Sequence, residues 1–397
     1  MQYMISVEEA KAIIRENANR LNYQRVPLLK AAGRVLATDI IAPYTIPAYP
    51  QSSMDGYAFA LRPGYRSYKL VGEMPAGSNQ SFQLKQGEAV RIFTGAAVPS
   101  GADTVLMQEK ARIEEGLLVI EPEGISTGSN VRPVGSEIQG GSRALAAGSL
   151  LTPAAIGFLA GAGITEVEVV PFPKVSIIVT GNELQKPGEP LEYGQVYEAN
   201  SFTLVTALQQ IGIEPLGVYK GADDPAQLTE ILSNALEISD LVLMTGGVSV
   251  GDYDFTALAF DACGVEKVFH KIRQKPGKPV LFGVKGNKLV FGLPGNPASV
   301  LTCYYQYVLL AFSLMSGVDL NLPVIRVPIN KVYAKAAGLT HFLKGYYNGE
   351  TVELLTGQES YKLNSFAMSN CLVEIGEDIT GLQEGSLMDI HLFSKTY

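Results

Sequence analysis

Residues that bind transition metals or form disulfides are scarce in this sequence. Three cysteines (Cys263, Cys303 and Cys371) and three histidines occur among 397 residues, without CxxC or paired-histidine spacing. An odd number of cysteines does not form a closed set of disulfides. The sequence therefore argues against a zinc or iron–sulfur centre, and any bound metal is expected to be a hard cation held by oxygen.

Positive charge is also in short supply, since 31 basic residues face 39 acidic ones and the formal net charge is −8 at pH 7. Nonspecific nucleic-acid binding needs a net basic face, so nucleic acid is not an expected partner. A local cluster can still attract a small anion. His270, Lys271, Arg273, Lys275 and Lys278 form such a cluster, and the prolines and glycine within it argue against a plain solvated helix.

Long apolar stretches are missing as well. No apolar run reaches the roughly 18 residues that suggest a membrane span. The first residues, MQYMISVEEAKAIIRENANRL, show an amphipathic helical pattern and not a secretion signal, so we expect a cytoplasmic protein without a membrane partner. With 47% hydrophobic and 18% charged residues, the composition is typical of a folded protein. The length indicates two to four structural units.

The hydrophobic pattern divides the chain into four parts. Residues 1–42 are predicted to be helical, with Ser6 and Glu9 forming a capping box at the start. Residues 43–140 show short β-like runs between glycine and proline turns. The segment 141–172 contains a second helix, expected to pack on the first, so that 1–42 and 141–172 form one discontinuous N-terminal domain with a β-rich insertion. Residues 319–397 alternate like a small β-barrel or sandwich.

Residues 173–318 have the pattern of an α/β domain. Hydrophobic strands alternate with helices, which predicts a parallel sheet covered on both faces. Ligands bind such sheets at the carboxyl ends of the strands. Four polar turns fall at that position: TGNEL, GADDP, TGGVSVGDYD and LPGNP. The predicted fold class is a multidomain α/β plus β protein with its ligand site at this edge.

Two of these turns suit an anionic ligand. In TGGVSVGDYD, Gly246 and Gly247 let backbone amides approach a ligand, Ser249 can hydrogen-bond it, and Asp254 can hold Mg²⁺. A glycine turn with aspartates is also an ordinary turn. In LPGNPAS, Asn296 begins a buried helix whose positive end suits an anion, although the same residues make an ordinary helix start.

Further candidates lie outside the strand ends. KPGKP presents Lys275 and Lys278 on a tight turn, which suits a phosphate or a tetrahedral dianion, and Lys271 can add to the same field. Asp55 in SSMDGYA and Thr94 in FTGAAVPSGAD belong to the β-rich part, where they could equally be turn residues. A site shared with the α/β domain would require the domains, or two subunits, to meet.

Taken in this order, the six motifs SSMDGYA, FTGAAVPSGADTV, TGNEL, TGGVSVGDYD, KPGKP and LPGNPAS resemble the molybdopterin molybdenumtransferase family, which includes the C-terminal domain of gephyrin. The resemblance covers essentially the whole chain. It implies a four-domain subunit and a homodimer with its active site near the subunit interface. It also implies insertion of molybdate into adenylylated molybdopterin with Mg²⁺ and release of AMP. The molybdopterin adenylyltransferase is a candidate partner.

The resemblance assigns roles residue by residue. The expected Mg²⁺ ligands are Glu183, Asp223 and Asp254. The expected catalytic residues are these three with Asp55, Thr94 and Lys271. The expected substrate-binding residues are Gly246, Gly247, Ser249, Lys275, Lys278, Pro294, Asn296, Ser299, Lys344 and Ser360. Lys344 stands where the family commonly has arginine, and lysine keeps the charge but loses the bidentate fork.

Two other functions fit parts of the pattern. The related adenylyltransferase shares the α/β domain, but an isolated copy would lack SSMDGYA, KPGKP and the C-terminal part. A scaffold that binds receptor peptides, as the gephyrin domain does, would not need the acidic and lysine positions that are retained here. Stoichiometric peptide binding without cofactor turnover would favour the scaffold.

Overall fold

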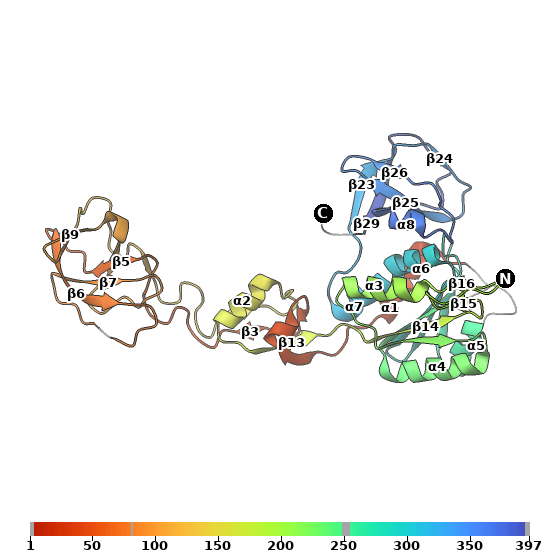
Figure 1. Ribbon diagram of the computed structural model, residues 1–397, viewed down its shortest axis with the longest axis horizontal. Helices are drawn as coiled ribbons and strands as arrows, with labels where there is room; N and C mark the ends of the chain where they lie inside the picture. Colours follow the sequence, from red (N-terminus) through yellow and green to blue (C-terminus); the bar gives the residue numbers. More distant parts are fainter. Residues whose placement is uncertain (1–3, 81, 248–254, 394–397) are drawn as a thin grey trace. The chain divides into compact units, whose positions relative to one another are not determined.

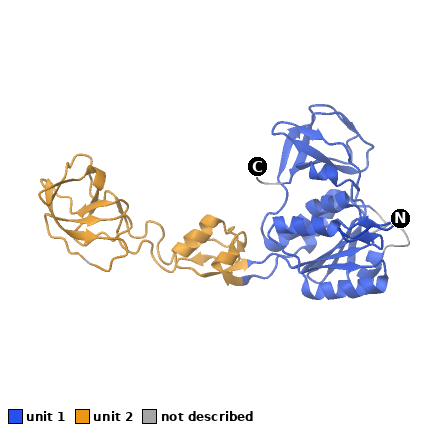
Figure 2. Ribbon diagram, in the orientation of Figure 1, with its two compact units in different colours: residues 1–24, 170–397 blue, residues 25–169 orange. Residues whose placement is uncertain are grey.

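The computed structural model describes residues 4–80, 82–247 and 255–393. Two compact units make up the chain, residues 1–24 with 170–397 and residues 25–169 (Figure 2). Of the predicted site residues, Ser249 and Asp254 lie outside the described ranges.

The larger unit is built on a six-stranded sheet in the order β17-β14-β18-β22-β21-β19. Alternate residues of its strands enter different cores: Ile177 lies in one hydrophobic cluster and Ile178 in another. Both faces are therefore buried, as the sequence predicts. The strands are β14 (Val175–Thr180), β17 (Gly217–Gly221), β18 (Leu241–Thr245), β19 (Glu266–His270), β21 (Leu281–Lys285) and β22 (Lys288–Leu293).

Helices cover the two faces of this sheet (Figure 1). On one face, α4 (Pro225–Ile238) and α5 (Phe255–Ala262) pack against each other. The opposite face is covered by α1 (Val7–Asn17), α3 (Asn200–Gln210), α6 (Pro297–Cys303) and α7 (Leu309–Ser316), with the π-helical turn Tyr304–Val308 between the last two.

The sheet is mixed, which corrects the prediction of a parallel one. Strands β17, β14, β18 and β22 are parallel, whereas β21 runs antiparallel to β22 and β19 antiparallel to β21. The physical reason is the two-residue connection Gly286–Asn287, in which Gly286 has a φ of +59°. Such a turn can join only antiparallel neighbours, because a parallel crossover needs a dozen residues or more.

The described residues from 324 to 392 form strands around a further hydrophobic core, so the β-rich character predicted for this part is confirmed. Strand β20 (Gln274–Lys275), from the KPGKP motif, pairs in parallel with β25 (Thr340–Tyr347) and so ties this part to the α/β domain. The sheet order is β20-β25-β27-β29-β23. The other strands are β23 (Val324–Pro328), β24 (Tyr333–Ala334), β26 (Val352–Leu354), β27 (Cys371–Ile375), β28 (Gly381–Leu382) and β29 (Leu387–Leu392), with the short helix α8 (Asn364–Ala367).

The described residues of the smaller unit form two larger sheets and two short strand pairs. One is a three-stranded sheet of β1 (Gln24–Pro27), β13 (Glu166–Val170) and β2 (Val35–Leu36), with α2 (Pro153–Gly161) and the 3-10 turn Leu28–Ala31. The other is a six-stranded sheet in the order β8-β5-β7-β6-β10-β9. Its strands are β5 (Gly56–Phe59), β6 (Ser67–Met74), β7 (Glu88–Ile92), β8 (Thr104–Met107), β9 (Arg112–Glu114) and β10 (Leu117–Val119). Short pairs are formed by β3 (Ile40–Ile41) with β12 (Arg143–Leu145) and by β4 (Gln51–Ser52) with β11 (Val131–Arg132).

In the N-terminal segment one predicted feature is present, whereas the length of the helix and its packing partner differ from the prediction. Its capping box is present, since the Ser6 hydroxyl accepts from the Glu9 amide at 3.0 Å and the Glu9 carboxylate accepts from the Ser6 amide at 2.6 Å. The helix, however, ends at Asn17, and the chain then forms β1, β2 and β3. The buried face of α1 packs on α7 in the larger unit, while Leu159 of α2 packs with Leu28 in the smaller one.

The continuous helical stretch Pro297–Ser316 is long and apolar enough to span a membrane, although polar residues such as Thr302 and Gln306 interrupt its apolar sequence. In the structure, 83% of its most apolar window is buried inside the protein. It is therefore explained as a core helix covering one face of the central sheet.

Candidate active site

A cavity of about 580 Å³, here called the edge cavity, lies where the parallel strands of the central sheet end. The turns after β14, β17, β18 and β22 all reach it, as expected for the carboxyl edge of such a sheet. Its lining includes the predicted residues Glu183, Asp223, Gly246 and Gly247. It also includes Thr180, Asn182, Asn200 and Gly295, which are not among the predicted site residues.

Asp223 is held in a fixed orientation at this edge. One carboxylate oxygen accepts a hydrogen bond from the Thr180 hydroxyl at 2.6 Å, and the other accepts from the Asn182 amide at 3.4 Å. The Asn182 side chain accepts in turn from the Asp223 amide at 3.2 Å. These contacts leave lone pairs on a pre-oriented carboxylate that faces the cavity, and Glu183 supplies a second one.

The glycine turn has a steric reason. Gly246 and Gly247 have φ values of +87° and +62°, in the left-handed region that favours glycine. A Cβ on Gly246 would lie 2.1 Å from the Thr180 carbonyl oxygen, and one on Gly247 would lie 2.9 Å from the Thr256 hydroxyl. The backbone thus comes close to the end of β14, and the cavity wall here is main chain.

Asn200 is the clearest residue that sequence reasoning missed. It is only 6% exposed, and its amide nitrogen donates to the Gly295 carbonyl at 2.9 Å, which fixes the LPGNP turn against α3. Its carbonyl oxygen is buried without a hydrogen-bond partner among the described residues. The signal in the sequence was an asparagine at the start of a helix, which is too common to indicate a site.

A second cavity of about 700 Å³, here called the basic cavity, lies between the KPGKP turn and the C-terminal strands of the same unit. Lys275 and Lys331 bring positive charge to its wall, and Tyr333, Ser360 and Tyr361 bring hydroxyl groups. Of the residues predicted to bind an oxyanion, Lys275 and Ser360 therefore lie together here.

The KPGKP turn is held from inside the protein. Gln274 is 1% exposed and donates from its amide to the carbonyls of Pro276 and Gly277, both at 3.0 Å. Its carbonyl oxygen accepts from the hydroxyl of Tyr307. Gly277 has a φ of +89°, and a Cβ there would lie 2.6 Å from the Cys303 sulfur. The turn is thus fixed, and the exposed Lys275 is presented from a rigid support.

Two hydrogen bonds join the start of α6, next to the edge cavity, to Ser360 of the basic cavity. Asn296 lies beside Gly295 of the edge cavity, and its side-chain amide donates to the Ser360 hydroxyl of the basic cavity at 3.0 Å. The Ala298 amide, in the first turn of α6, donates to the Ser360 carbonyl at 3.1 Å. The start of α6 therefore touches the loop that carries Ser360.

The remaining predicted residues of this unit line neither cavity: Lys271, Lys278, Pro294, Ser299 and Lys344. Ser299 is 2% exposed within α6. Lys271 has a φ of +95°, a strained conformation for a residue other than glycine. Lys344 is 2% exposed, and its ammonium group donates to three backbone carbonyls. An ammonium group has three N–H donors, and all three of these are used by the carbonyls. Lys344 therefore has no donor left for the direct contact with an oxyanion that we expected.

Asp55 and Thr94 lie together in the smaller unit. The amide and the hydroxyl of Thr94 both donate to one oxygen of the Asp55 carboxylate, each at 2.7 Å. These two hydrogen bonds, first the backbone one, lower the pKa of Asp55 below its ordinary value. The exposed carboxylate is therefore ionised at neutral pH and suited to accept hydrogen bonds from a ligand.

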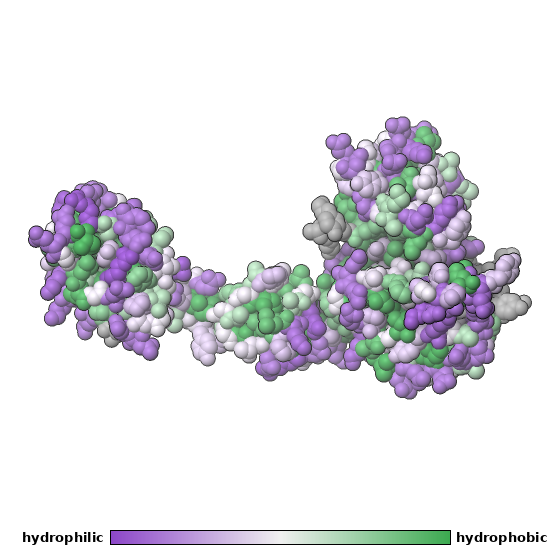
Figure 3. All heavy atoms as spheres, viewed as in Figure 1, coloured by the Kyte–Doolittle hydropathy of each residue, from purple (hydrophilic) through white to green (hydrophobic). Residues whose placement is uncertain are grey.

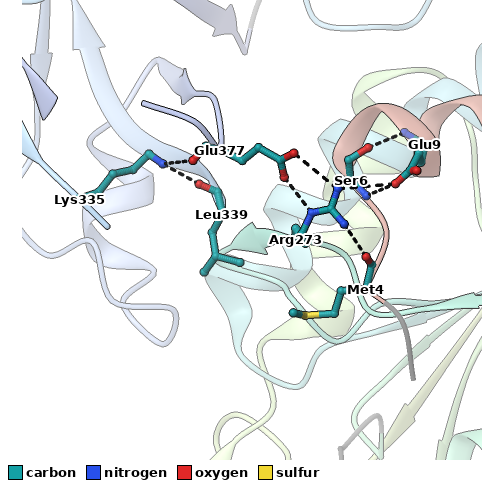
Figure 4. A network of polar contacts seen from close by, with 7 residues as sticks. All are labelled: Met4, Ser6, Glu9, Arg273, Lys335, Leu339 and Glu377. Atoms are coloured by element: carbon teal, nitrogen blue, oxygen red, sulfur yellow. Dashed lines mark hydrogen bonds and ion pairs between the residues drawn. The ribbon is translucent and has the colours of Figure 1, made fainter. Parts of the chain in front are cut away.

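A polar network ties the N-terminal segment to the KPGKP region (Figure 4). The Arg273 guanidinium donates to the Met4 carbonyl at 2.7 Å and to the Glu377 carboxylate at 2.9 Å. Lys335 donates to the carbonyls of Leu339 and Glu377 from the other side. Arg273, two residues before the first lysine of the KPGKP motif, therefore serves as an anchor between three segments of the unit.

Three sequence families match successive parts of the chain. They are described as the MoeA N-terminal region (domain I and II) over residues 5–163, the probable molybdopterin binding domain over 176–312, and the MoeA C-terminal region (domain IV) over 326–393. The fold agrees with this. A molybdopterin biosynthesis protein, moeA, from Pyrococcus horikoshii OT3 superposes with a TM-score of 0.80 at 29% identity, covering 98% of this chain and all of that one. The class defined by fold and site is thus a MoeA-like multidomain protein with a central molybdopterin-binding-type domain.

Curated relatives narrow this class. The molybdopterin molybdenumtransferase of Haemophilus influenzae is 34% identical over 376 residues, covering 92% of this chain and 93% of that protein. The enzyme of the same name from Staphylococcus aureus strain Mu50 is 31% identical, covering 98% of this chain and 95% of that protein. The chain belongs to the molybdopterin molybdenumtransferase family, whose members are transferases.

Proposed function

We propose that this protein inserts molybdenum from molybdate into adenylylated molybdopterin, with Mg²⁺-dependent release of AMP. The observation that carries the proposal is the pairing of two unlike cavities in one unit. The edge cavity offers carboxylates and a glycine turn, the basic cavity offers Lys275 and Ser360, and the Asn296–Ser360 hydrogen bond joins them. The edge cavity would bind Mg²⁺ and the phosphate of adenylylated molybdopterin, and the basic cavity would bind molybdate.

The edge cavity suits a hard divalent cation. Asp223 and Glu183 supply carboxylate oxygens, which are the ligands that Mg²⁺ prefers, and Asp254 outside the described residues would complete the proposed set. Within the described ranges no group of three or more acidic, histidine or cysteine side chains is close enough to hold a metal by itself. This fits Mg²⁺, which usually keeps several waters and takes further oxygens from a phosphate. When bound, Mg²⁺ would neutralise charge on the pyrophosphate.

The chain's own residues would position the two substrates. The main chain at Gly246 and Gly247 allows close approach of the phosphate, and Ser249 is the proposed hydroxyl partner. Lys275 and Ser360 would donate to molybdate oxygens. The sulfurs that capture the metal would be those of molybdopterin, because all three cysteines are buried and burial raises the pKa of each thiol.

The decisive experiment incubates purified protein with adenylylated molybdopterin, Mg²⁺ and molybdate and follows AMP release. We expect release to depend on both Mg²⁺ and molybdate. Mg²⁺-dependent formation of adenylylated molybdopterin from ATP and molybdopterin would instead identify an adenylyltransferase. Tight peptide binding with no AMP release would indicate a scaffold.

A homodimer is part of the proposal. Helix α2 consists of apolar residues, yet only Leu159 is fully buried in it, and the surface of this segment is correspondingly apolar (Figure 3). An exposed apolar surface of this kind favours a protein partner, and the family resemblance specifies a second copy. In such a dimer, Asp55 and Thr94 would serve the site of the partner subunit. The protein would act in the cytoplasm, where the molybdopterin adenylyltransferase is a candidate partner.

Subunit mixing tests this arrangement. Inactive Asp55→Ala protein and inactive Asp223→Ala protein should regain activity when their subunits exchange, because half of the dimers would be hybrids with one intact site. The expected recovery is about a quarter of the wild-type activity. No recovery after exchange verified by mass spectrometry would mean that each site is made within one chain, or that Asp55 has no role.

A further inference from the structure

Lys344 is a buried cation with an unusual set of partners. It lies in β25 and is 2% exposed. Its ammonium group donates to the carbonyl oxygens of Gly357 at 2.7 Å, Lys362 at 3.1 Å and Glu359 at 3.3 Å. All three acceptors belong to one loop, residues 357–362. All three donors of the ammonium group are therefore used, and the loop surrounds the ammonium group with its carbonyl oxygens.

The main chain of Lys344 also holds the loop, through the side chain of Gln358. The Oε1 atom of Gln358 accepts from the backbone amide of Lys344 at 2.9 Å, and its Nε2 atom donates to the backbone carbonyl of Lys344 at 2.8 Å. The Ser365 hydroxyl donates to the carbonyls of Gly357 and Lys362, at 2.7 and 3.3 Å. Two of the residues that fix the loop, Lys344 and Ser365, do not line the basic cavity.

The outer side of the same loop faces the site. Gly357, Gln358, Glu359, Ser360 and Tyr361 all line the basic cavity. Through its hydroxyl and its carbonyl, Ser360 also accepts hydrogen bonds from Asn296 and Ala298 at the start of α6. A displacement of the loop would move the Ser360 hydroxyl and release this contact with the edge-cavity side.

We propose that Lys344 is a positioning residue, which sets the loop 357–362 and thereby the oxyanion-binding geometry of Ser360 without touching the oxyanion. This inference rests on the proposed function of the basic cavity. In this role the ammonium group of Lys344 makes contacts that the guanidinium group of an arginine could not make in the same way. A planar guanidinium spreads its five donors over a rigid fork and cannot direct three of them from one point toward three converging carbonyls.

The test compares Lys344→Met and Lys344→Arg with Lys285→Met as a matched control. Lys285 is exposed at the end of β21 and lines neither cavity, so the control removes an equal charge without touching the loop. We expect both Lys344 variants to raise the molybdate concentration for half-maximal AMP release about tenfold or more. The half-saturating concentration of adenylylated molybdopterin should change less than about twofold, and the control should resemble wild type.

Amide hydrogen exchange provides a second readout that does not depend on turnover. In both Lys344 variants, exchange should accelerate at residues 357–362 and at Ala298, whereas amides of β14 and β18 should keep wild-type rates. If Lys344→Met does not fold, Ser365→Ala supplies the same test in a milder form, because it removes one donor to Gly357 and Lys362.

Two results would overturn the inference. Retained or improved molybdate use in Lys344→Arg, together with a large loss in Lys344→Met, would show that residue 344 contacts the oxyanion directly. Unchanged exchange of the loop amides in Lys344→Met would show that the ammonium group does not hold the loop. A wild-type protein without molybdate-dependent turnover would refute the proposed function, while the exchange measurement would still decide the role of Lys344.

Discussion

The edge cavity and the basic cavity belong to one unit, yet the net charge of the lining side chains is negative in the first and positive in the second. The edge cavity places Asp223 and Glu183 beside a glycine turn, whereas the basic cavity places Lys275 and Lys331 beside hydroxyl groups. The acidic lining of the first cavity favours a cation, and the lysines of the second favour an oxyanion. Hydrogen bonds from Asn296 and Ala298 to Ser360 join the loop of the basic cavity to the start of α6, which follows the edge-cavity residue Gly295.

The largest effect is expected when a carboxylate of the edge cavity loses its charge. Asp223→Asn keeps an oxygen that can accept from the Thr180 hydroxyl but removes the negative charge. If Asp223 binds Mg²⁺, the variant should lose about 100-fold to 1,000-fold of AMP release at limiting Mg²⁺. Steady-state rates at several Mg²⁺ concentrations measure this loss.

Glu230→Gln is the control for that experiment, since Glu230 is an exposed carboxylate on α4 and lies outside both cavities. It should leave the Mg²⁺ dependence unchanged. Equal turnover of Asp223→Asn and wild type at limiting Mg²⁺ would remove Asp223 from the metal site.

An intermediate effect is expected when a lysine of the basic cavity is removed. Lys275→Ala should raise the molybdate concentration for half-maximal activity about tenfold to a hundredfold, which is the usual cost of removing one charged hydrogen bond. Lys278→Ala should have a smaller effect, because Lys278 does not line the basic cavity. Titration of activity with molybdate, and with sulfate as competitor, gives both values.

Lys285→Ala, at the exposed end of β21, controls for loss of a lysine elsewhere in the unit and should match wild type. A stronger effect of Lys278→Ala than of Lys275→Ala would place the oxyanion outside the basic cavity.

The smallest expected effect concerns stability next to the basic cavity. His341 is 7% exposed and bonds to the Tyr333 hydroxyl at 3.0 Å. Burial, and then the charges of Lys335 and Lys275, lower the pKa of His341 to about 4. An unfolded histidine has a pKa near 6.5, so its neutral form favours the folded state above that pH. This contribution is lost as the pH falls from about 6.5 toward 4.

Urea unfolding at pH 7 and pH 4.5 measures this effect. Wild type should lose on the order of 1–3 kcal/mol more of its free energy of unfolding than His341→Gln, in which no imidazole titrates. The carboxylates titrate in both proteins, so the difference isolates His341. Parallel losses in the two proteins would contradict the assignment.

Local patterns in the sequence predicted those parts of the fold and site that depend on neighbouring residues. The Ser6–Glu9 capping box and the strands ending at Thr180 and Thr245 follow from short-range spacing, and so does the position of the glycine turn. The antiparallel edge was missed because the Gly286–Asn287 signal is only two residues long. The role of Lys344 depends on carbonyls 13 to 18 residues away in the chain, which spacing alone does not reveal.

The position of α1 has a consequence for the order of synthesis. Helix α1 comprises Val7–Asn17, but its packing partner α7 comprises Leu309–Ser316, and Arg273 joins Met4 to Glu377. On the ribosome, the helix is therefore made early and finds its neighbours only when most of the chain has emerged. The unit 25–169 is contiguous and can complete its contacts during that interval. Until α7 has been made, the packing partner that buries Val7, Ala10 and Ile14 of α1 does not yet exist.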